Sequence, residues 1–294
     1  MTKNPIAVRD DNVPVGEGQT FFQALRALGL AHFEMGVNFE GGVWTVAQNG
    51  APCNVADDAG VADLKARLQE EGASVAALLL HTDFSGDQAD KHAAFTVRAA
   101  HVAQQLGVSA IRLDPLTSKS ELSREQICDN VARHIKEILA QTKNTGVEFG
   151  LENHGVVGND PRFLDDVFAA VGDDRLGMTL DTANFYWSGM PLSEVYATLE
   201  HFAPRAKHTH FKSIAYPENV RETRREPDSG YAQYCMPLDK GDFDLVRVIR
   251  ILRDAGYAGS LCIEDESLPR VAQDEKADVL RGEIAALQAA QQSA

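Results

Sequence analysis

Four polar residues stand at the ends of short apolar runs, and their types and spacing could support metal chemistry. They are Glu152, Asp181, His210 and Glu264, separated in turn by 29, 29 and 54 residues. If strand ends bring them to one mouth, three carboxylates and an imidazole need a counter-charge to stay ionised. A divalent cation supplies it. An O/O/O/N ligand set favours Mn²⁺ or Mg²⁺, with Co²⁺ or Zn²⁺ as alternatives.

The apolar runs that carry these residues predict strands buried on both faces of a parallel sheet. In chain order they span 31–37, 74–80, 109–113, 147–151, 176–180, 207–211 and 260–263. Segments with helical periodicity lie between them, at 88–106, 123–143, 244–255 and 275–288. The second of these opens with the capping-box pattern of Ser123 and Gln126.

This alternation predicts a (β/α)8 TIM barrel, as one domain over residues 1–294. The competing open doubly wound sheet loses support because neither GxGxxG nor GxxxxGK[ST] occurs. We expect the eighth strand between Phe211 and Asp242, near 233–237. The three spacings then correspond to one, one and two strand–helix units, so the four residues skip one strand around the rim.

Each of the four residues also has a simpler interpretation. A lone Glu or Asp at a strand end usually caps a helix, and Asp181 is well placed for that. A lone His210 is more often a hydrogen-bonded core histidine, and His208, deeper on the same side of its strand, is expected to be structural. Four such residues at barrel spacing nevertheless argue for one shared site.

Composition and charge exclude several classes of partner. The 294 residues contain 28 Lys and Arg against 43 Asp and Glu, for a net charge of −15. Nucleic acids and anionic membranes both require a basic surface, so neither is expected. The first 18 residues contain no apolar core for a signal peptide, and no run approaches 18 apolar residues, which predicts a cytoplasmic protein. The four cysteines lie far apart without a CxxC pair, which favours reduced thiols over one disulfide.

Several runs resemble the sugar phosphate isomerase/epimerase family of the xylose isomerase-like TIM-barrel superfamily. They are GLENH at 150–154, LDTAN at 180–184, HTHFK at 208–212 and GYAGSLCIE at 256–264. The resemblance covers roughly residues 25–270 and is strongest over 147–270. The family includes tagatose and psicose 3-epimerases, inosose dehydratases and isomerases, and 3-dehydroshikimate dehydratases.

The resemblance implies roles for the four residues. All four would be ligands of one divalent cation, and Glu152 and Glu264 would also be the catalytic acid/base pair on opposite faces of a bound sugar. Such carboxylates can exchange a proton next to a carbonyl that the cation holds, through an enediolate. Two departures from the ketose 3-epimerases concern the substrate: Asn184 stands where they have His, and Tyr216 where they have Arg.

Other polar residues are candidates for substrate binding. They are His81, His154, Asn184 and Lys212, and Lys212 matches a pattern common in the isomerases and dehydratases of the family. For Glu34 and Asp114, a rim or capping role is as well supported as function. The polar segment 217–234, with Arg221, Arg224 and Arg225, is either a solvated loop or a lid that brings cations to an acidic substrate.

These observations leave more than one function open. The first is a metal-dependent isomerase or epimerase of a sugar, keto-sugar or cyclitol, and the second is a metal-dependent lyase or dehydratase with the same site. An endonuclease for damaged DNA, known in the superfamily, is disfavoured by the charge of −15 and by the single well-placed ligand histidine. A sugar-binding barrel without activity is disfavoured by the complete ligand set. The sequence leaves open whether copies of the chain form a homo-oligomer.

Overall fold

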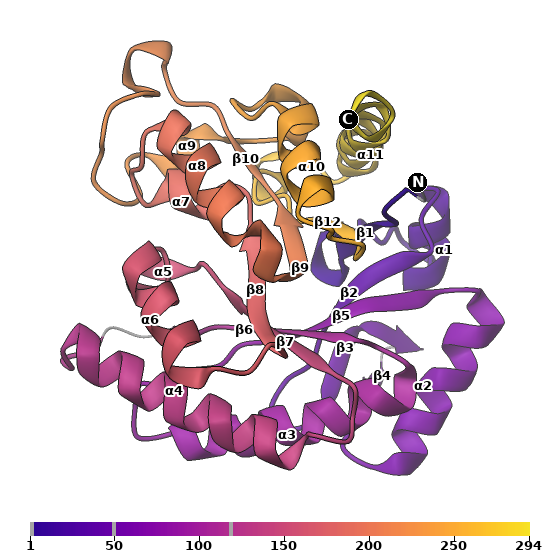
Figure 1. Ribbon diagram of the computed structural model, residues 1–294. Helices are drawn as coiled ribbons and strands as arrows, with labels where there is room; N and C mark the ends of the chain where they lie inside the picture. The colour runs from indigo at the N-terminus through magenta and orange to yellow at the C-terminus, as the bar shows by residue number, and fades with distance from the viewer. Residues whose placement is uncertain (1–2, 49–50, 118–119) are drawn as a thin grey trace.

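Eight short parallel strands close into a barrel at the centre of the molecule (Figure 1). The computed structural model describes residues 3–48, 51–117 and 120–294. In the order in which neighbours pair, the strands are β1 (Ile6–Arg9), β12 (Leu261–Ile263), β9 (Ala206–Phe211), β8 (Leu176–Asp181), β7 (Glu148–Glu152), β6 (Ala110–Leu113), β5 (Ser74–Leu80) and β2 (His32–Gly36), which pairs again with β1. Most strand residues are buried, because helices cover the outer face and side chains fill the interior.

Helices form the outer layer of the barrel. They are α1 (Phe21–Ala27), α2 (Asp58–Glu71), α3 (Ala89–Leu106), α4 (Arg124–Gln141), α5 (Gly155–Gly158), α6 (Pro161–Val171), α7 (Asn184–Trp187), α8 (Leu192–Phe202), α9 (Tyr231–Tyr234), α10 (Leu245–Asp254) and α11 (Lys276–Ser293). Short 3₁₀ helices are η1 (Asp10–Asn12), η2 (Ala203–Arg205), η3 (Glu218–Val220), η4 (Leu238–Lys240) and η5 (Leu268–Arg270). Figure 1 shows α2, α3, α4 and α6 along one side of the barrel and α8, α10 and α11 along the other.

The four predicted helices are confirmed as α3, α4, α10 and α11. Helix α4 begins where the sequence indicates, because Ser123 and Gln126 form a reciprocal capping box. In α10, the side chains of Val248, Ile249 and Leu252 are buried on one face, which fixes the helix against the barrel.

Two small antiparallel sheets lie outside the barrel. β3 (Gly42–Gln48) pairs with β4 (Ala51–Asn54), and β10 (Ser213–Ile214) pairs with β11 (Cys235–Met236). The second pair closes the base of the loop that contains residues 217–234, so both ends of this segment start from the rim of the barrel.

The seven predicted strands are confirmed, but the predicted position of the eighth is wrong. Residues 235–236, inside the expected 233–237, form the short strand β11 on the rim instead. The eighth barrel strand is β1, close to the N-terminus, which pairs with both β12 and β2. β12 therefore pairs directly with β9, through Cys262 opposite His210, and the expected skipped strand does not exist.

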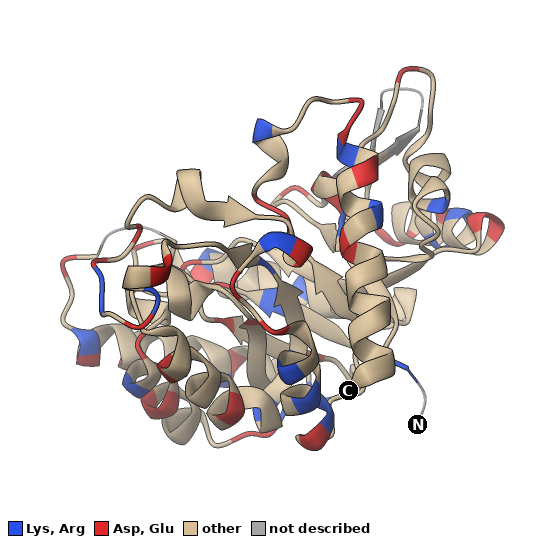
Figure 2. Ribbon diagram, turned by 90° about the horizontal axis from the view of Figure 1, so that it is seen from above, with Lys and Arg blue, Asp and Glu red and all other residues tan. Residues whose placement is uncertain are grey.

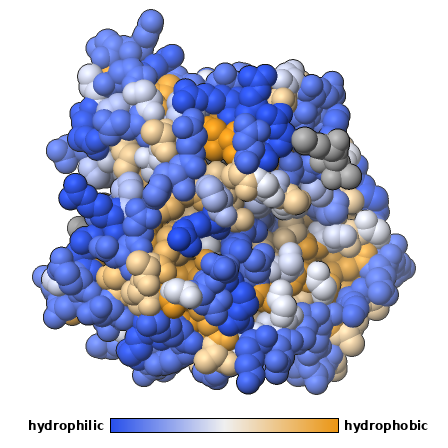
Figure 3. Space-filling view, in the orientation of Figure 1, coloured by the Kyte–Doolittle hydropathy of each residue, from blue (hydrophilic) through white to orange (hydrophobic). Residues whose placement is uncertain are grey.

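The surface is polar and carries charges of both signs. Figure 2 shows acidic and basic residues interspersed over helices and loops, and the face in Figure 3 is mostly hydrophilic with small hydrophobic patches. The four cysteines are unpaired and buried, as the prediction of reduced thiols requires. Within the described ranges, every helix is too short or too polar to cross a membrane.

Candidate metal centre

The four residues predicted as ligands lie together at the carboxyl ends of four adjacent barrel strands. Glu152 and Asp181 are the last residues of β7 and β8, His210 lies in β9, and Glu264 directly follows β12. Each side chain is buried and offers one ligand atom, and these atoms all lie within 4.8 Å of one another. We call this set the ligand cluster. It lies at the mouth of the barrel where active sites of this fold are built.

Each glutamate of the ligand cluster is paired with an arginine from a neighbouring strand. Arg112 of β6 forms an ion pair with Glu152, and Arg9 of β1 forms one with Glu264. Burial acts to raise the pKa of Glu152, but Arg112 and a nearby imidazole outweigh it and lower that pKa. Burial acts on Glu264 in the same way, and Lys212 is the largest of the positive charges that hold its pKa well below the usual range. Both glutamates are therefore ionised, and the protein itself supplies part of the counter-charge.

Asp181 uses its two carboxylate oxygens in two ways. Oδ1 accepts the backbone N–H groups of Ala183 at 2.8 Å and Asn184 at 2.6 Å, where α7 begins. Oδ2 lies 3.3 Å from Lys212 Nζ and faces the ligand cluster. Burial raises the pKa of Asp181 to about 7, although Lys212 lowers it. The capping and cluster interpretations are thus both realised in one side chain. The amide of Asn184 lies 3.4 Å from Glu152, so this predicted substrate residue contacts the cluster.

His210 contacts carboxylates on both edges of its ring. Nδ1 lies 3.1 Å from Glu152 Oε1 and 3.3 Å from Glu264 Oε2. Nε2 lies 2.9 and 3.0 Å from the two oxygens of Glu34. Burial acts to lower the pKa of His210, but Glu34, Glu264 and Glu152 raise it well above the usual range. The imidazole therefore carries a proton on each nitrogen when only protein groups surround it.

Lys212 lies among three carboxylates at the edge of the cluster. Its Nζ is 3.1 Å from both Glu264 and Glu266, and 3.3 Å from Asp181. Tyr231, in α9, donates a hydrogen bond to Glu266 at 2.5 Å. The segment 217–234 thereby contacts the mouth through Tyr231. A role of Lys212 in substrate binding stays a prediction.

The three arginines of that segment are bound to groups of the protein itself. Arg225 donates to four backbone carbonyls, two of them outside the segment, and lies over the ring of Tyr186, 4.6 Å from its centroid. Arg221 pairs with Asp242 at 3.0 Å, and Arg224 pairs with a glutamate of α8 on the surface. These contacts fasten the segment to the barrel, so they do not support the expectation of cations held ready for an acidic substrate. The lid itself stays a prediction.

Asp114 orients two histidines at the mouth. Its Oδ1 lies 2.7 Å from His154 Nδ1, and its Oδ2 lies 3.4 Å from His81 Nδ1. Asp114 is buried, whereas the side chains of His81 and His154 are 68% and 44% exposed. The hydrogen bond with Asp114 raises the pKa of His154. Both predicted substrate residues are therefore accessible imidazoles held by a buried carboxylate.

Three cavities lie near the mouth of the barrel, and one of them is lined by a residue of the ligand cluster. One of about 460 Å³ is lined by Arg9 and Glu264, and one of about 570 Å³ by Arg9 and His81. A third, of about 510 Å³, is lined by His154 and shares Thr117 with the second. Cavities of this size accommodate a small polar molecule.

The donor set of the cluster fits a divalent cation. Three buried carboxylate oxygens, Glu152 Oε2, Asp181 Oδ2 and Glu264 Oε2, accept no hydrogen bond from the described part of the chain, although cationic side chains lie within ion-pair distance. A cation among these oxygens would add to the counter-charge that Arg112 and Lys212 supply, and three carboxylates with one imidazole suit Mn²⁺, Mg²⁺ or Zn²⁺.

Two arginines of the site escaped the sequence analysis. Arg9 belongs to the strand that the sequence analysis missed. Arg112 lies within the run 109–113, and an arginine inside an otherwise apolar strand was the available signal, because a buried charge needs a partner. Glu34 and Asp114, for which a rim role was equally open, are instead both buried against histidines of the mouth.

The fold and the ligand cluster define a (β/α)8 barrel with a candidate metal centre at its mouth. More narrowly, the chain belongs to the family of xylose isomerase-like TIM barrels, which it matches over residues 22–289.

An inosose dehydratase of Clostridium perfringens is 24% identical over 280 residues, which are 91% of this chain and 90% of that protein. Among solved structures, an L-ribulose 3-epimerase has a TM-score of 0.68 at 15% identity, covering 99% of this chain and 96% of the other. A xylose isomerase-like TIM barrel protein of Mycobacterium smegmatis in complex with magnesium has a TM-score of 0.67 at 16% identity, covering 96% and 98%. The IOLI protein with a bound zinc atom has a TM-score of 0.68 at 16% identity, covering 97% and 98%.

Proposed function

We propose that this chain is a divalent-cation-dependent isomerase or epimerase of a sugar, keto-sugar or cyclitol, which removes a proton next to a carbonyl and returns it. The observation that carries the proposal is the buried ligand cluster, with three carboxylate oxygens that accept no hydrogen bond from described residues. Membership of the xylose isomerase-like barrels and the likeness to an L-ribulose 3-epimerase support it. The cavities near the mouth offer room for such a substrate.

The residues of the site would have three different roles: binding the cation, transferring the proton and orienting the carboxylates. Glu152, Asp181, His210 and Glu264 would hold the cation, which when bound polarises the substrate carbonyl and offsets the negative charge that develops there. Glu152 and Glu264 come from β7 and β12 and would take and return the proton from opposite sides of the substrate. Their arginine partners keep both carboxylates ionised and oriented.

A dehydratase is the second candidate, because one pair of residues could give a proton to a leaving hydroxyl. His154 is bound to Asp114, is partly exposed, and offers a nitrogen within 4.8 Å of a Glu152 oxygen. The raised pKa of His154 favours its protonated form near neutral pH. The likeness to an inosose dehydratase over 91% of the chain supports this candidate. Both reactions begin with the same proton abstraction and differ in whether a β-hydroxyl then leaves.

For the cation we propose Mn²⁺ or Mg²⁺, because three of the four ligands are hard carboxylate oxygens. Related folds solved with magnesium and with zinc support a divalent ion in general, and Co²⁺ or Zn²⁺ are the alternatives.

Exchange of a substrate C–H for deuterium tests the proposal. Protein loaded with Mn²⁺ and placed in D₂O with a panel of ketoses, inososes and dehydroshikimate is expected to exchange one C–H of at least one member, as seen by proton NMR. Protein treated with a chelator is the control and should exchange nothing. A recovered isomer supports the first candidate, and loss of water supports the second. Fully loaded protein that exchanges no C–H of any panel member would count against both.

Binding of the cation is expected to strengthen as the pH rises. The pKa of His210 is raised by Glu34, Glu264 and Glu152 against the effect of burial, so the ring must release its Nδ1 proton before it can act as a ligand. Below that pKa, each pH unit should raise the apparent affinity by up to about tenfold, and more steeply below about pH 7, where Asp181 must also lose a proton; above the pKa of His210 the affinity should level off. Titration of Mn²⁺ in buffers of different ionisation enthalpy measures the released proton. Proton-neutral binding between about pH 6 and 8 would contradict this.

A further inference from the structure

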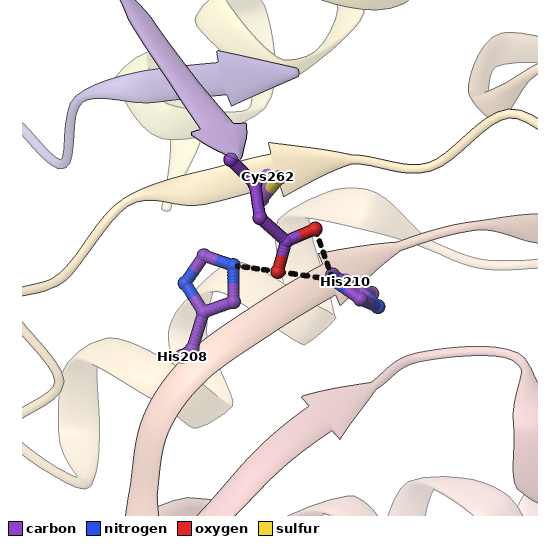
Figure 4. A group of neighbouring side chains, drawn as sticks. His208, His210 and Cys262 are labelled. Atoms are coloured by element: carbon purple, nitrogen blue, oxygen red, sulfur yellow. Dashed lines mark hydrogen bonds and ion pairs between the residues drawn. The ribbon is translucent and has the colours of Figure 1, made fainter. Parts of the chain in front are cut away.

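A second layer of polar side chains lies directly beneath the ligand cluster, inside the barrel. Glu34 of β2 reaches across to two histidines of β9, with Oε1 3.1 Å from His208 Nε2 and both oxygens within 3.0 Å of His210 Nε2. Figure 4 shows the rings of His208 and His210 on one strand facing a single carboxylate, with Cys262 alongside. The exposed fraction of the whole residue is 0% for Glu34, His210 and Cys262 and 1% for His208. Polar groups buried this deeply are kept only where each has a partner.

The layer has the composition of a zinc site, but the direction of the rings indicates a different use. Glu34, His208, His210 and Cys262 could together offer O, N, N and S ligands. However, Nδ1 of His210 already faces the ligand cluster, and Nε2 on the opposite edge faces Glu34. One imidazole would have to bridge two cations to fill both sites. With a single cation in the ligand cluster, Nε2 of His210 keeps its proton and donates a hydrogen bond to Glu34.

We propose that Glu34 is the positioning residue of the metal centre: it binds Nε2–H of His210, which leaves the Nδ1 lone pair directed at the ligand cluster, and His208 braces it. The inference rests on the proposed function, because it takes His210 to be a ligand. It extends that function to a residue outside the set predicted from the sequence. A histidine ligand whose second nitrogen donates to a carboxylate is fixed in both tautomer and orientation.

The charge of Glu34 matters for its role as the acceptor of the His210 Nε2–H. Burial acts to raise the pKa of Glu34, but His210 and His208 lower it below its usual range, so the group is a carboxylate at neutral pH. An ionised acceptor forms a stronger hydrogen bond with an imidazole than a neutral amide does. It also makes Nδ1 a better donor to the cation. Loss of such an outer partner typically lowers metal affinity about 10–100-fold.

Glu34→Gln tests the proposal, because glutamine keeps the volume and one acceptor oxygen but removes the charge. The Kd for Mn²⁺, measured by competition with a chelating dye, is expected to rise about 10–100-fold while the stoichiometry stays at one ion per chain. With Zn²⁺ bound, ¹⁵N NMR of labelled histidines should show His210 ligated through Nδ1 with Nε2 protonated in the wild type. That signal should broaden or shift in the variant. A role in folding alone would change the loaded fraction and the Tm, and would leave the Kd and the tautomer of the folded protein unchanged.

Two control variants separate this effect from general damage. Glu283→Gln replaces another buried carboxyl group, on α11, which accepts the Leu238 N–H and whose pKa burial raises well above the usual range, and it should leave the Kd unchanged. Cys262→Ser changes the same layer but not the hydrogen bond between Glu34 and His210, because Cys262 Sγ donates to the Ile263 carbonyl, and it should also leave the Kd unchanged. If Glu34→Gln does not fold, Glu34→Asp retains the charge but withdraws it from Nε2 and should likewise weaken binding.

Three outcomes would overturn the inference. One is that the folded Glu34 variants keep the wild-type Kd for Mn²⁺ and the wild-type tautomer of His210. Another is a thiolate charge-transfer band in Co²⁺-loaded protein that Cys262→Ser abolishes, since the ion would then lie in the lower layer with Glu34 as a ligand. The third is wild-type protein that binds no divalent ion, which would remove the proposed function as well. The first leaves the proposed function standing.

Discussion

Replacing Asp181 with asparagine is expected to raise the Kd of the centre for Mn²⁺ by about 100-fold or more. A direct ligand should matter at least as much as an outer partner, whose loss costs about 10–100-fold. Asparagine keeps the Oδ1 acceptor that binds the N–H groups of Ala183 and Asn184, so the start of α7 should survive. It removes the anionic Oδ2 that faces the cluster. Elemental analysis and dye competition measure the loss, and activity at limiting Mn²⁺ should fall with it.

Asp10→Asn is the matched control for that variant. Asp10 is also a buried carboxylate at the mouth, and burial raises its pKa to about 6. Its oxygens bind the Gly36 N–H and the Thr45 hydroxyl and lie outside the ligand cluster. The control should bind Mn²⁺ as the wild type does. If Asp181→Asn also retains the full metal content and activity, Asp181 is a capping residue and not a ligand.

The strands that sequence reasoning found are those whose burial on both faces leaves a continuous apolar run. β5 was predicted to the residue at both ends, because SVAALLL contains no polar residue after its first. β1, with the sequence IAVR, is as short as β6 and longer than β12, both of which were predicted. No segment with helical periodicity precedes β1, so the alternation of strands and helices did not indicate it, and only closure of the barrel between β12 and β2 reveals it.

The residues of the ligand cluster could be predicted from the sequence, whereas the residues that form ion pairs with them could not. The ends of parallel barrel strands must meet, so the position of Glu152 or His210 along the chain almost determines its place in space. The contact between Glu34 and His210 crosses 176 residues and the lumen of the barrel, and no spacing rule relates the two. Arg9 and Glu264 are 255 residues apart but lie on the adjacent strands β1 and β12, so their contact follows only once β1 is recognised as a strand. Local patterns identify the strand ends, while pairing across the lumen depends on the register of the closed sheet.

The largest effect on rate is expected from the two glutamates of the cluster. Glu152→Gln and Glu264→Gln should each lower the rate of substrate C–H exchange in D₂O by about 10²–10⁴-fold, the usual contribution of a positioned acid or base. Glutamine can still offer an oxygen to the cation, so these variants are expected to retain more metal than Asp181→Asn. The measurement compares the exchange rate with the metal content in the same sample at saturating Mn²⁺. This separates loss of the proton carrier from loss of the ligand.

The two glutamates are expected to differ in how much metal they retain after substitution. Arg112 pairs with Glu152 in a fully buried contact, whereas Arg9, the partner of Glu264, also lines two of the cavities. Neutralising Glu152 leaves the buried positive charge of Arg112 less compensated beside the cation. Glu152→Gln should therefore lose more of its metal than Glu264→Gln. In a sample that is still loaded, lost exchange identifies the altered residue as a proton carrier. If both variants hold the ion and exchange at the wild-type rate, the carboxylates act only as ligands, and Lys212 or His154 becomes the base to test next.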